Sequence, residues 1–180
     1  PVDGNTAVAA LRDVYAGRGQ LACLIVSKRD VENRFDAESA QRLISDGAAH
    51  LIGNPANAEV QLIALGAYQL DEAIKAQQHL AELGKCACVT VVLEPGRLRI
   101  PRDAIEAEFV DDDVTVSTMF PSGLPRVIVT HTRPEPMLGI LRRIDSGPAK
   151  TRALGYISRG GTFDVPGMLF ANRCTWADAI

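Results

Sequence analysis

Short apolar runs alternate with helical patterns along most of the chain, and this alternation restricts the fold more than any other feature. Five runs have the length and the aliphatic or β-branched content of strands: residues 21–26, 60–65, 86–93, 126–131 and 151–157. Helical spacing of apolar residues marks the segments 5–16, 36–47, 70–84 and 135–144 and a last helix after Asp164. Strands that alternate with helices form a sheet covered by helices on both faces. The sequence therefore predicts a three-layer α/β fold with a mostly parallel, mixed five-stranded sheet.

Residues at the helix ends predict where several helices start and stop. Asp36 is expected to be an N-cap, and Gly47 follows the end of the same helix. In the longest helix, Asp71 and Glu72 are expected in the first turn, where the helix dipole favours acids, and Gly84 is the stop. The irregular stretch between the third and fourth runs leaves room for a short helix at residues 103–109.

The composition is typical of a soluble globular protein and excludes several classes of protein. The chain has 180 residues, with 22 acidic residues against 19 Lys and Arg, and a net charge of −3. This balance is too neutral for a nucleic-acid-binding domain, which has a strongly basic face. No apolar run approaches the roughly 20 residues that cross a bilayer, and no secretory signal opens the chain. We therefore expect a cytoplasmic protein with no nucleic-acid or membrane partner.

A connector at residues 52–59 contains Gly, Pro and two Asn and marks the best internal boundary. Residues 1–53 are expected to be the tail end of a preceding α/β domain with its linker, and residues 54–180 a complete second domain. The chain begins with Pro1 rather than Met. We therefore expect a piece cut from a larger protein.

The cysteines do not form a metal-binding pattern. Cys86 and Cys88 form a Cys-x-Cys pair, but a zinc site needs two more ligands. The remaining Cys23 and Cys174, like the three histidines, are scattered along the chain. We expect buried, reduced cysteines, because a free cysteine packs as a small apolar residue. No metal ligand, cofactor-binding residue or catalytic residue is predicted in this chain.

Histidines and glycines give only weak signals for a site. His131 lies at the C-terminal edge of a predicted strand, where α/β proteins place ligands. His79 is expected to be exposed on its helix, and His50 precedes the connector. The glycine-rich segments 17–20 and 158–162 match no phosphate-binding fingerprint and are expected to be turns.

Lys28 and Arg29 directly follow the apolar run at residues 21–26, at the edge where ligands bind. Two adjacent cations there could receive a phosphate by charge, and Arg adds a bidentate fork. The competing interpretation is a solvated pair of loop charges. On the pattern alone, both interpretations stay open.

Four segments together resemble the last quarter of a thiamine-diphosphate-dependent phosphoketolase, within the wider transketolase superfamily. CLIVSKRDVENRF, at residues 23–35, resembles the end of the family's pyrimidine-binding domain. The segment 58–94, with its strand, Gly, Leu-rich helix and Val-rich strand, resembles the opening of the C-terminal domain. RVIVTHTRPEPMLGILRRI (126–144) and GYISRGGTFDVPGMLFANRCTW (155–176) resemble the later strand, helix and closing segment.

The resemblance implies a fold, a function and a division of labour. Residues 1–53 would be the tail end of the pyrimidine-binding domain plus linker, and residues 54–180 a transketolase C-terminal-like domain. The whole enzyme would cleave ketose phosphates and pass a two-carbon unit to phosphate, as in phosphoketolases, or to an aldose, as in transketolases. Thiamine diphosphate and Mg would be bound by the upstream domains of the same polypeptide, in a homodimer.

This fragment would be mainly structural and dimer-forming, and inactive by itself. The resemblance places Lys28, with Arg29 beside it, at the position that binds the sugar-phosphate substrate. Two alternatives remain: a standalone non-catalytic α/β interaction or binding module, and the corresponding domain of a 2-oxo acid dehydrogenase. In the latter a Lys-Arg pair would have no phosphate to bind.

Overall fold

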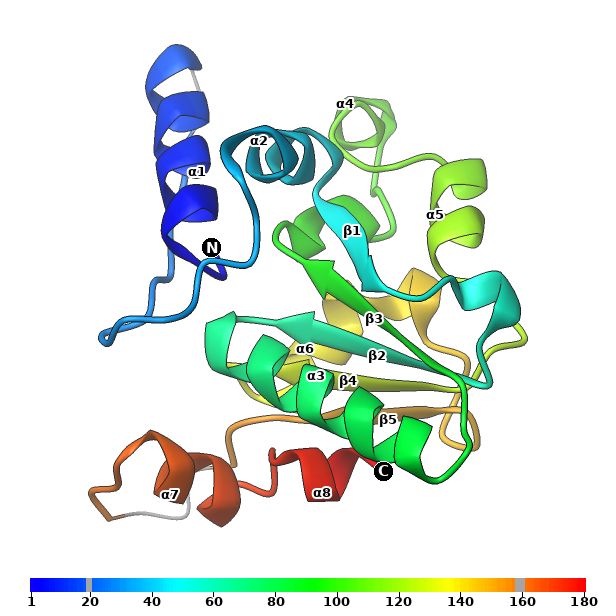
Figure 1. Cartoon of the computed structure of the whole chain (residues 1–180). Coiled ribbons are helices and arrows are strands. Elements are labelled where there is room, and N and C mark those ends of the chain that lie inside the picture. The colour runs from blue at the N-terminus through cyan, green and yellow to red at the C-terminus, as the bar shows by residue number, and fades with distance from the viewer. Residues whose placement is uncertain (19–20, 158–160) are drawn as a thin grey trace.

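A computed structural model describes residues 1–18, 21–157 and 161–180 (Figure 1). The strands are β1 (Ala48–Ile52), β2 (Val60–Leu65), β3 (Ala87–Val92), β4 (Arg126–Thr130) and β5 (Thr151–Leu154). The helices are α1 (Gly4–Ala16), α2 (Ala37–Asp46), α3 (Ala67–Glu82), α4 (Ala104–Ala107), α5 (Asp113–Met119), α6 (Pro134–Ile140), α7 (Val165–Ala171) and α8 (Trp176–Ala179). Short 3-10 turns occupy Pro55–Asn57, Pro95–Leu98 and Arg142–Ile144. Parts of both expected glycine-rich turns fall on residues 19–20 and 158–160, outside the described residues.

The five strands form one mixed sheet in the order β1-β3-β2-β4-β5. The pairs β2–β3, β2–β4 and β4–β5 are parallel, and β1 pairs with β3 in the antiparallel direction. In Figure 1, α3 lies in front of the sheet and α6 lies behind it. Parallel strands need such crossover helices, and covering both faces buries the central strands. The predicted three-layer α/β fold is therefore confirmed.

Alternate residues of the central strands pack into two separate hydrophobic cores. Leu62 and Val89 face the core that contains α3, whereas Ile63 and Ile128 face the core that contains α5 and α6. Side chains on successive strand residues point to opposite faces. The continuous apolar runs of β2, β3 and β4 thus reflect burial on both faces, which is why their sequences predict strands well.

The prediction of a buried strand at residues 21–26 is wrong. This segment is extended but joins no sheet, and Leu21, Ile25 and Val26 are 105%, 56% and 57% exposed. Within the described residues, its backbone makes no backbone hydrogen bond. The edge of β3 is instead taken by β1, which the sequence placed in and before the connector. A strand needs a partner for its ladder, and composition alone does not show which segment supplies it.

Strand β1 lies on the N-terminal side of the expected domain boundary. It precedes residue 54 and yet belongs to the same sheet as β2 to β5. The division of the chain into domains at residues 53 and 54 stays a prediction. As packed structure, residues 48–52 belong with the residues that follow.

Helix ends agree with the sequence where a capping residue is present. Asp36 Oδ1 accepts a hydrogen bond from the Ser39 amide at 2.7 Å, and Gly47 adopts φ = 74° at the end of α2. Gly84 follows α3 with φ = 73°, as expected of a stop. The start of α3 differs, because Gly66 is its N-cap. Asp71 and Glu72 therefore lie beyond the first turn, which corrects the prediction.

The other helices show smaller differences. The short helix α4 falls inside the expected 103–109, and Asp164 caps α7 as expected. The predicted helix 135–144 is shorter, because α6 ends at Ile140 and a 3-10 turn follows. Neither α5 nor α8 was predicted, since α5 is short and mostly polar and α8 is only four residues long.

Glu72 attaches the C-terminal helix α8 to α3. Its carboxylate is buried, with Oε1 accepting from Lys75 Nζ at 2.6 Å and Oε2 from the Trp176 amide at 2.7 Å. The Trp176 ring stacks on His79 with 3.9 Å between ring centroids. The terminal segment is thus fixed by one buried acceptor and one stacked ring.

Replacing Glu72 by alanine is expected to lower the free energy of unfolding by about 1–3 kcal/mol, because the Trp176 amide loses its buried acceptor. Urea denaturation measures this change. Gln78→Ala is the control: Gln78 is an exposed residue on the same helix, and its loss is expected to cost within about 0.5 kcal/mol. Equal effects of the two substitutions would contradict the role of Glu72.

Two of the four cysteines are buried as expected, and two are not. Cys88 and Cys174 are buried, and burial raises the pKa of each thiol to about 11. Cys23 and Cys86 are exposed, which corrects the prediction of four buried cysteines. Cys23 is exposed because its segment joins no sheet, and Cys86 because β3 begins one residue later.

The described residues lack two features that would point to a membrane or a metal ion. They contain no helix with the length and apolar content to span a bilayer. They also contain no group of three or more His, Cys, Asp or Glu side chains placed to share a metal ion.

Candidate functional site

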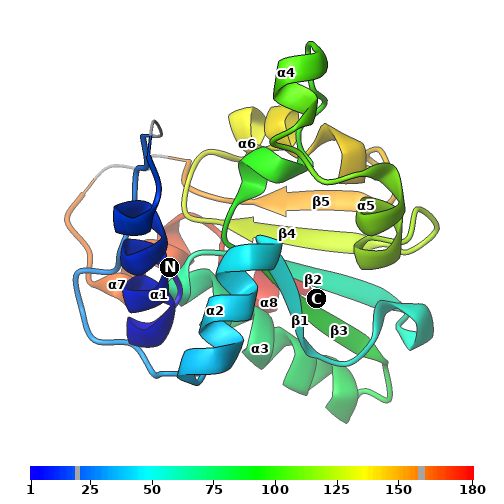
Figure 2. The ribbon, with the colours of Figure 1, turned by 90° about the horizontal axis from the view of Figure 1, so that it is seen from above.

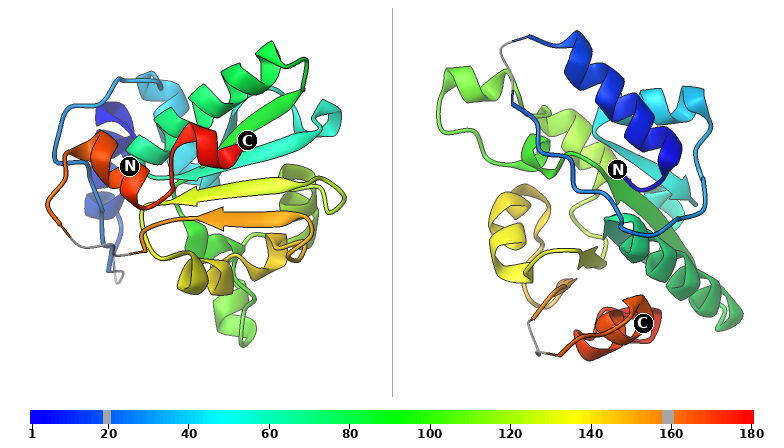
Figure 3. Two further views of the ribbon diagram at one scale, coloured as in Figure 1. Left: turned by 90° about the horizontal axis from the view of Figure 1, so that it is seen from below. Right: turned by 90° about the vertical axis from the view of Figure 1, so that its left-hand side faces the viewer.

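A cavity of about 460 Å³ lies at the carboxyl ends of β2 and β4. These strands are neighbours, but their connections leave in opposite directions: α3 leads from β2 to β3, and α6 leads from β4 to β5. In open α/β sheets, ligands bind in the crevice at this switch of direction. The right panel of Figure 3 faces this edge, and Figure 2 shows α1 and the segment after it flanking the sheet there. The topology therefore makes this edge of the sheet, where the cavity opens, a candidate binding site.

Gly66 and His131 form the floor of the cavity, directly after β2 and β4. Gly66 adopts φ = 118°, and a Cβ there would collide with Gln69 Oε1 and lie 3.3 Å from the His131 ring. His131 Nδ1 lies 2.9 Å from the Leu65 carbonyl oxygen. Since a carbonyl oxygen only accepts, Nδ1 carries a proton and donates in this contact. His131 is thus held in one orientation at the edge where the sequence placed it.

The N-terminus of α3 opens into the same cavity through Gly66, Ala67, Tyr68 and Gln69. Among the residues that the structure describes, no side chain caps this helix. The first amides of a helix have no intrahelical acceptor and carry partial positive charge. The cavity therefore receives donor groups that suit an anion.

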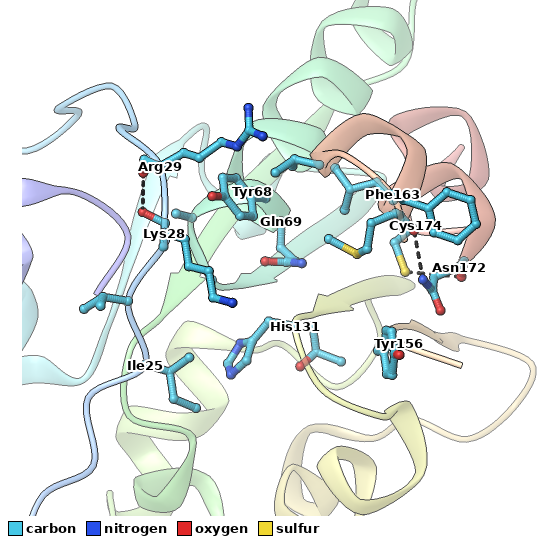
Figure 4. A pocket seen from close by; sticks show the side chains of 18 of the residues that line it. Ile25, Lys28, Arg29, Tyr68, Gln69, His131, Tyr156, Phe163, Asn172 and Cys174 are labelled. Atoms are coloured by element: carbon cyan, nitrogen blue, oxygen red, sulfur yellow. Dashed lines mark hydrogen bonds between the residues drawn. The ribbon is translucent and has the colours of Figure 1, made fainter. Parts of the chain in front are cut away.

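Lys28 and Arg29, the two predicted phosphate-binding residues, both line this cavity. Figure 4 shows the Lys28 side chain pointing into it, toward the space between Gln69 and His131. Arg29 points away past Tyr68, and its carbonyl accepts from Ser27 Oγ at 2.8 Å. The structure thus joins Lys28 with His131, which the sequence had treated as separate candidates. Arg29 lies at the rim.

The far wall of the cavity is largely apolar and comes from the C-terminal segment. Tyr156, Phe163, Met168 and Leu169 contribute to it. Asn172 is buried in this wall, where Oδ1 accepts from the Ile157 amide at 2.7 Å and Nδ2 donates to the Met168 carbonyl at 2.9 Å. Its side chain therefore holds the wall in place.

The other two histidines lie outside the cavity. His50 Nδ1 is 2.9 Å from Thr90 Oγ1, and partial burial lowers the pKa of His50. His79 is only partly exposed, because it stacks on Trp176. Neither is placed to contact a ligand of this site.

Sequence reasoning missed Gly66 and Gln69. A glycine between a strand and a helix was visible at residue 66, and it marks a close approach of the backbone. Gln69 carried no signal, because its burial depends on the fold around it. The sequence pattern predicted Lys28, whereas Gly66 and Gln69 became candidates only once the fold was known.

Solved transketolases share this fold. A mutant transketolase of Pichia stipitis in complex with xylulose 5-phosphate matches 99% of this chain and 23% of its own, with a TM-score of 0.61 and 14% identity. A mutant transketolase from the same organism gives a TM-score of 0.59 and 17% identity over the same shares. A transketolase from Leishmania mexicana gives a TM-score of 0.55 and 14% identity, over 77% of this chain and 18% of its own.

No protein-family model and no curated protein matches the sequence. At the identities above, the likeness establishes the fold, and the expected transketolase C-terminal-like α/β architecture is confirmed. The chain spans less than a quarter of the length of these transketolases.

The described residues do not fit a thiamine diphosphate site of their own. A diphosphate-bound divalent cation needs a set of oxygen ligands. Their carboxylates, cysteines and histidines form no group that could share a metal ion, and the sequence has no Gly-Asp-Gly…Asn run. No catalytic step through that cofactor is assigned to this chain.

Proposed function

We propose that the chain is the C-terminal part of a thiamine-diphosphate-dependent enzyme of the transketolase type, which transfers a two-carbon unit from a ketose phosphate. The observation that carries the proposal is the fold match over 99% of the chain to a transketolase in complex with xylulose 5-phosphate. The cofactor, when bound by the upstream domains, supplies the electron sink for carbon–carbon cleavage. This chain supplies packing surface and the phosphate contact of Lys28.

The placement of Lys28 supports this role. Lys28 is exposed, and its side chain extends toward the space between Gln69 and His131 in the cavity (Figure 4). An ammonium group binds a phosphate as a compact charge with three donors. Within the proposal, Lys28 holds the phosphate of the sugar and Arg29 adds positive charge at the rim.

The exposed segment 21–26 supports an upstream partner in the same polypeptide. It carries six consecutive apolar residues whose backbone makes no backbone hydrogen bond within the described part of the chain. Such a segment is a ready partner for the edge of another sheet. We infer that the preceding domain supplies that sheet and buries these side chains.

The finer assignments remain part of the proposal. The sequence resemblance favours a phosphoketolase, in which phosphate accepts the two-carbon unit and acetyl phosphate forms. A transketolase would pass the unit to an aldose. A homodimeric, cytoplasmic parent enzyme is likewise proposed from the resemblance alone.

Lys28→Ala in the longer enzyme is expected to raise KM for the ketose phosphate several-fold, because one charged contact to the substrate is lost. Steady-state kinetics measure this change. Lys150→Ala is the control, since Lys150 is an exposed lysine at the opposite edge of the sheet and its loss should leave KM unchanged. An unchanged KM for Lys28→Ala would remove Lys28 from the substrate site.

A further inference from the structure

The cavity at the carboxyl ends of β2 and β4 is lined by the side-chain amide of Gln69. Gln69 is only 4% exposed, yet its side chain makes no hydrogen bond with any residue that the structure describes. Figure 4 shows this amide pointing into the cavity, toward Lys28 and His131. The amide therefore faces the space of the cavity, where it is free to bond a ligand or water.

A second set of unpaired donors borders the same space. The amides of Ala67, Tyr68 and Gln69 begin the 16-residue helix α3, and none of them has an acceptor among the described residues. The backbone at Gly66, whose φ is 118°, leaves room beside them that a Cβ would fill. Helix N-termini of this kind bind phosphate and other anions. Gln69 adds an independent, side-chain donor at the same place.

The charges that face the cavity favour an anion. Lys28 points into it and Arg29 lies at its rim (Figure 4). Among the described residues that line it, Asp164 is the carboxylate, and its Oδ1 already accepts from the Gly167 amide at 2.9 Å. Positive charge and free donors therefore meet at the end of the cavity near α3.

The opposite end of the cavity is largely apolar. Tyr156, Phe163 and Met168 line it with aromatic and thioether surface. A ligand that fills about 460 Å³ would place an apolar or aromatic portion there. The two ends together describe an anion joined to an apolar body.

We propose that this cavity is a binding site for a small organic phosphate, with its phosphate at the N-terminus of α3 against Gln69 and Lys28. The apolar or aromatic body of the ligand lies against Tyr156, Phe163 and Met168. The site belongs to this chain and binds its ligand without the upstream domains. It shares Lys28 with the proposed function but does not depend on ketose-phosphate turnover.

The test is isothermal titration of the 180-residue chain with inorganic phosphate, phenyl phosphate and phenol. Phenyl phosphate is expected to bind with a Kd of about 1 mM or tighter. Inorganic phosphate is expected to bind more weakly, because it leaves the apolar wall unfilled, and phenol more weakly still. Absence of phenyl phosphate binding, or equal binding of phenol, would overturn the proposal.

Gln69→Leu is expected to weaken phenyl phosphate binding about tenfold or more, the loss that follows from removing one hydrogen bond to a charged group. Gln78→Leu, at an exposed position of the same helix, should bind as the unchanged chain does. Circular dichroism of each variant checks that it is folded. Equal affinity in the two variants would overturn the role of Gln69.

If Gln69→Leu does not fold, Lys28→Ala against Lys150→Ala decides the same question. Only Lys28→Ala is expected to weaken binding, and an equal effect of both would overturn the site. Failure of the proposed enzyme activity would show in turnover by the longer protein. It would leave these binding results unchanged, so the two proposals fail separately.

Discussion

Arg126→Ala is expected to destabilise the chain by about 3 kcal/mol or more, because it leaves buried carbonyl groups without donors. Arg126 begins β4 and is 1% exposed. Its guanidinium donates to the Ile144 carbonyl at 2.6 Å, to the Pro121 carbonyl at 2.5 Å and to the Leu124 carbonyl at 3.3 Å. One side chain therefore joins the loop before β4 to the turn before β5.

The measurement is urea denaturation followed by circular dichroism. Arg152→Ala is the matched control, since Arg152 is an exposed arginine on the neighbouring strand β5. It is expected to change the free energy of unfolding by no more than about 0.5 kcal/mol. A small effect of Arg126→Ala, similar to that of Arg152→Ala, would show that the loop and turn are held by other contacts.

Ile25→Asp is expected to destabilise the 180-residue chain only slightly and the longer protein strongly. In the 180-residue chain, Ile25 is 56% exposed, so a charge there should cost less than about 1 kcal/mol. In the longer protein, the proposed upstream sheet buries this side chain. An unpaired charge in such a place costs several kcal/mol, and the protein is expected to unfold or to lose its assembly.

Thermal denaturation of both proteins, each with and without the substitution, measures this contrast. Ile105→Asp is the control, because Ile105 is 71% exposed and lies outside the apolar segment. It should be tolerated in both settings. Equal tolerance of Ile25→Asp in the longer protein would contradict the burial of residues 21–26 by an upstream domain.

The central strands could be predicted because both of their faces are buried. In β2, Leu62 and Ile63 face opposite cores, so the run is apolar without interruption. The ends of α2 could be predicted because Asp36 and Gly47 act locally, within one turn. Most of the correct predictions therefore rest on local helix capping and on strands that are buried on both faces.

The wrong strand prediction at residues 21–26 arose because the local sequence does not determine which segments pair in the sheet. Residues 21–26 have a stronger strand composition than β1, yet β1 is the segment that follows α2 and reaches β3. The same limit applies to the site. Lys28 and His131 each lie at a predicted strand edge, but only the strand order β3-β2-β4 brings them to one cavity. Gln69 became a candidate only because the fold buries it there.

The central claim is that this chain completes an enzyme that cleaves ketose phosphates. Its most direct test compares the longer protein with the 180-residue chain, each assayed with a ketose phosphate, thiamine diphosphate and Mg²⁺. An aldose acceptor or inorganic phosphate in the assay separates transketolase from phosphoketolase activity. We expect two-carbon transfer by the longer protein and none by the 180 residues alone. Turnover by the isolated chain, or none by the longer protein with either acceptor, would contradict the claim.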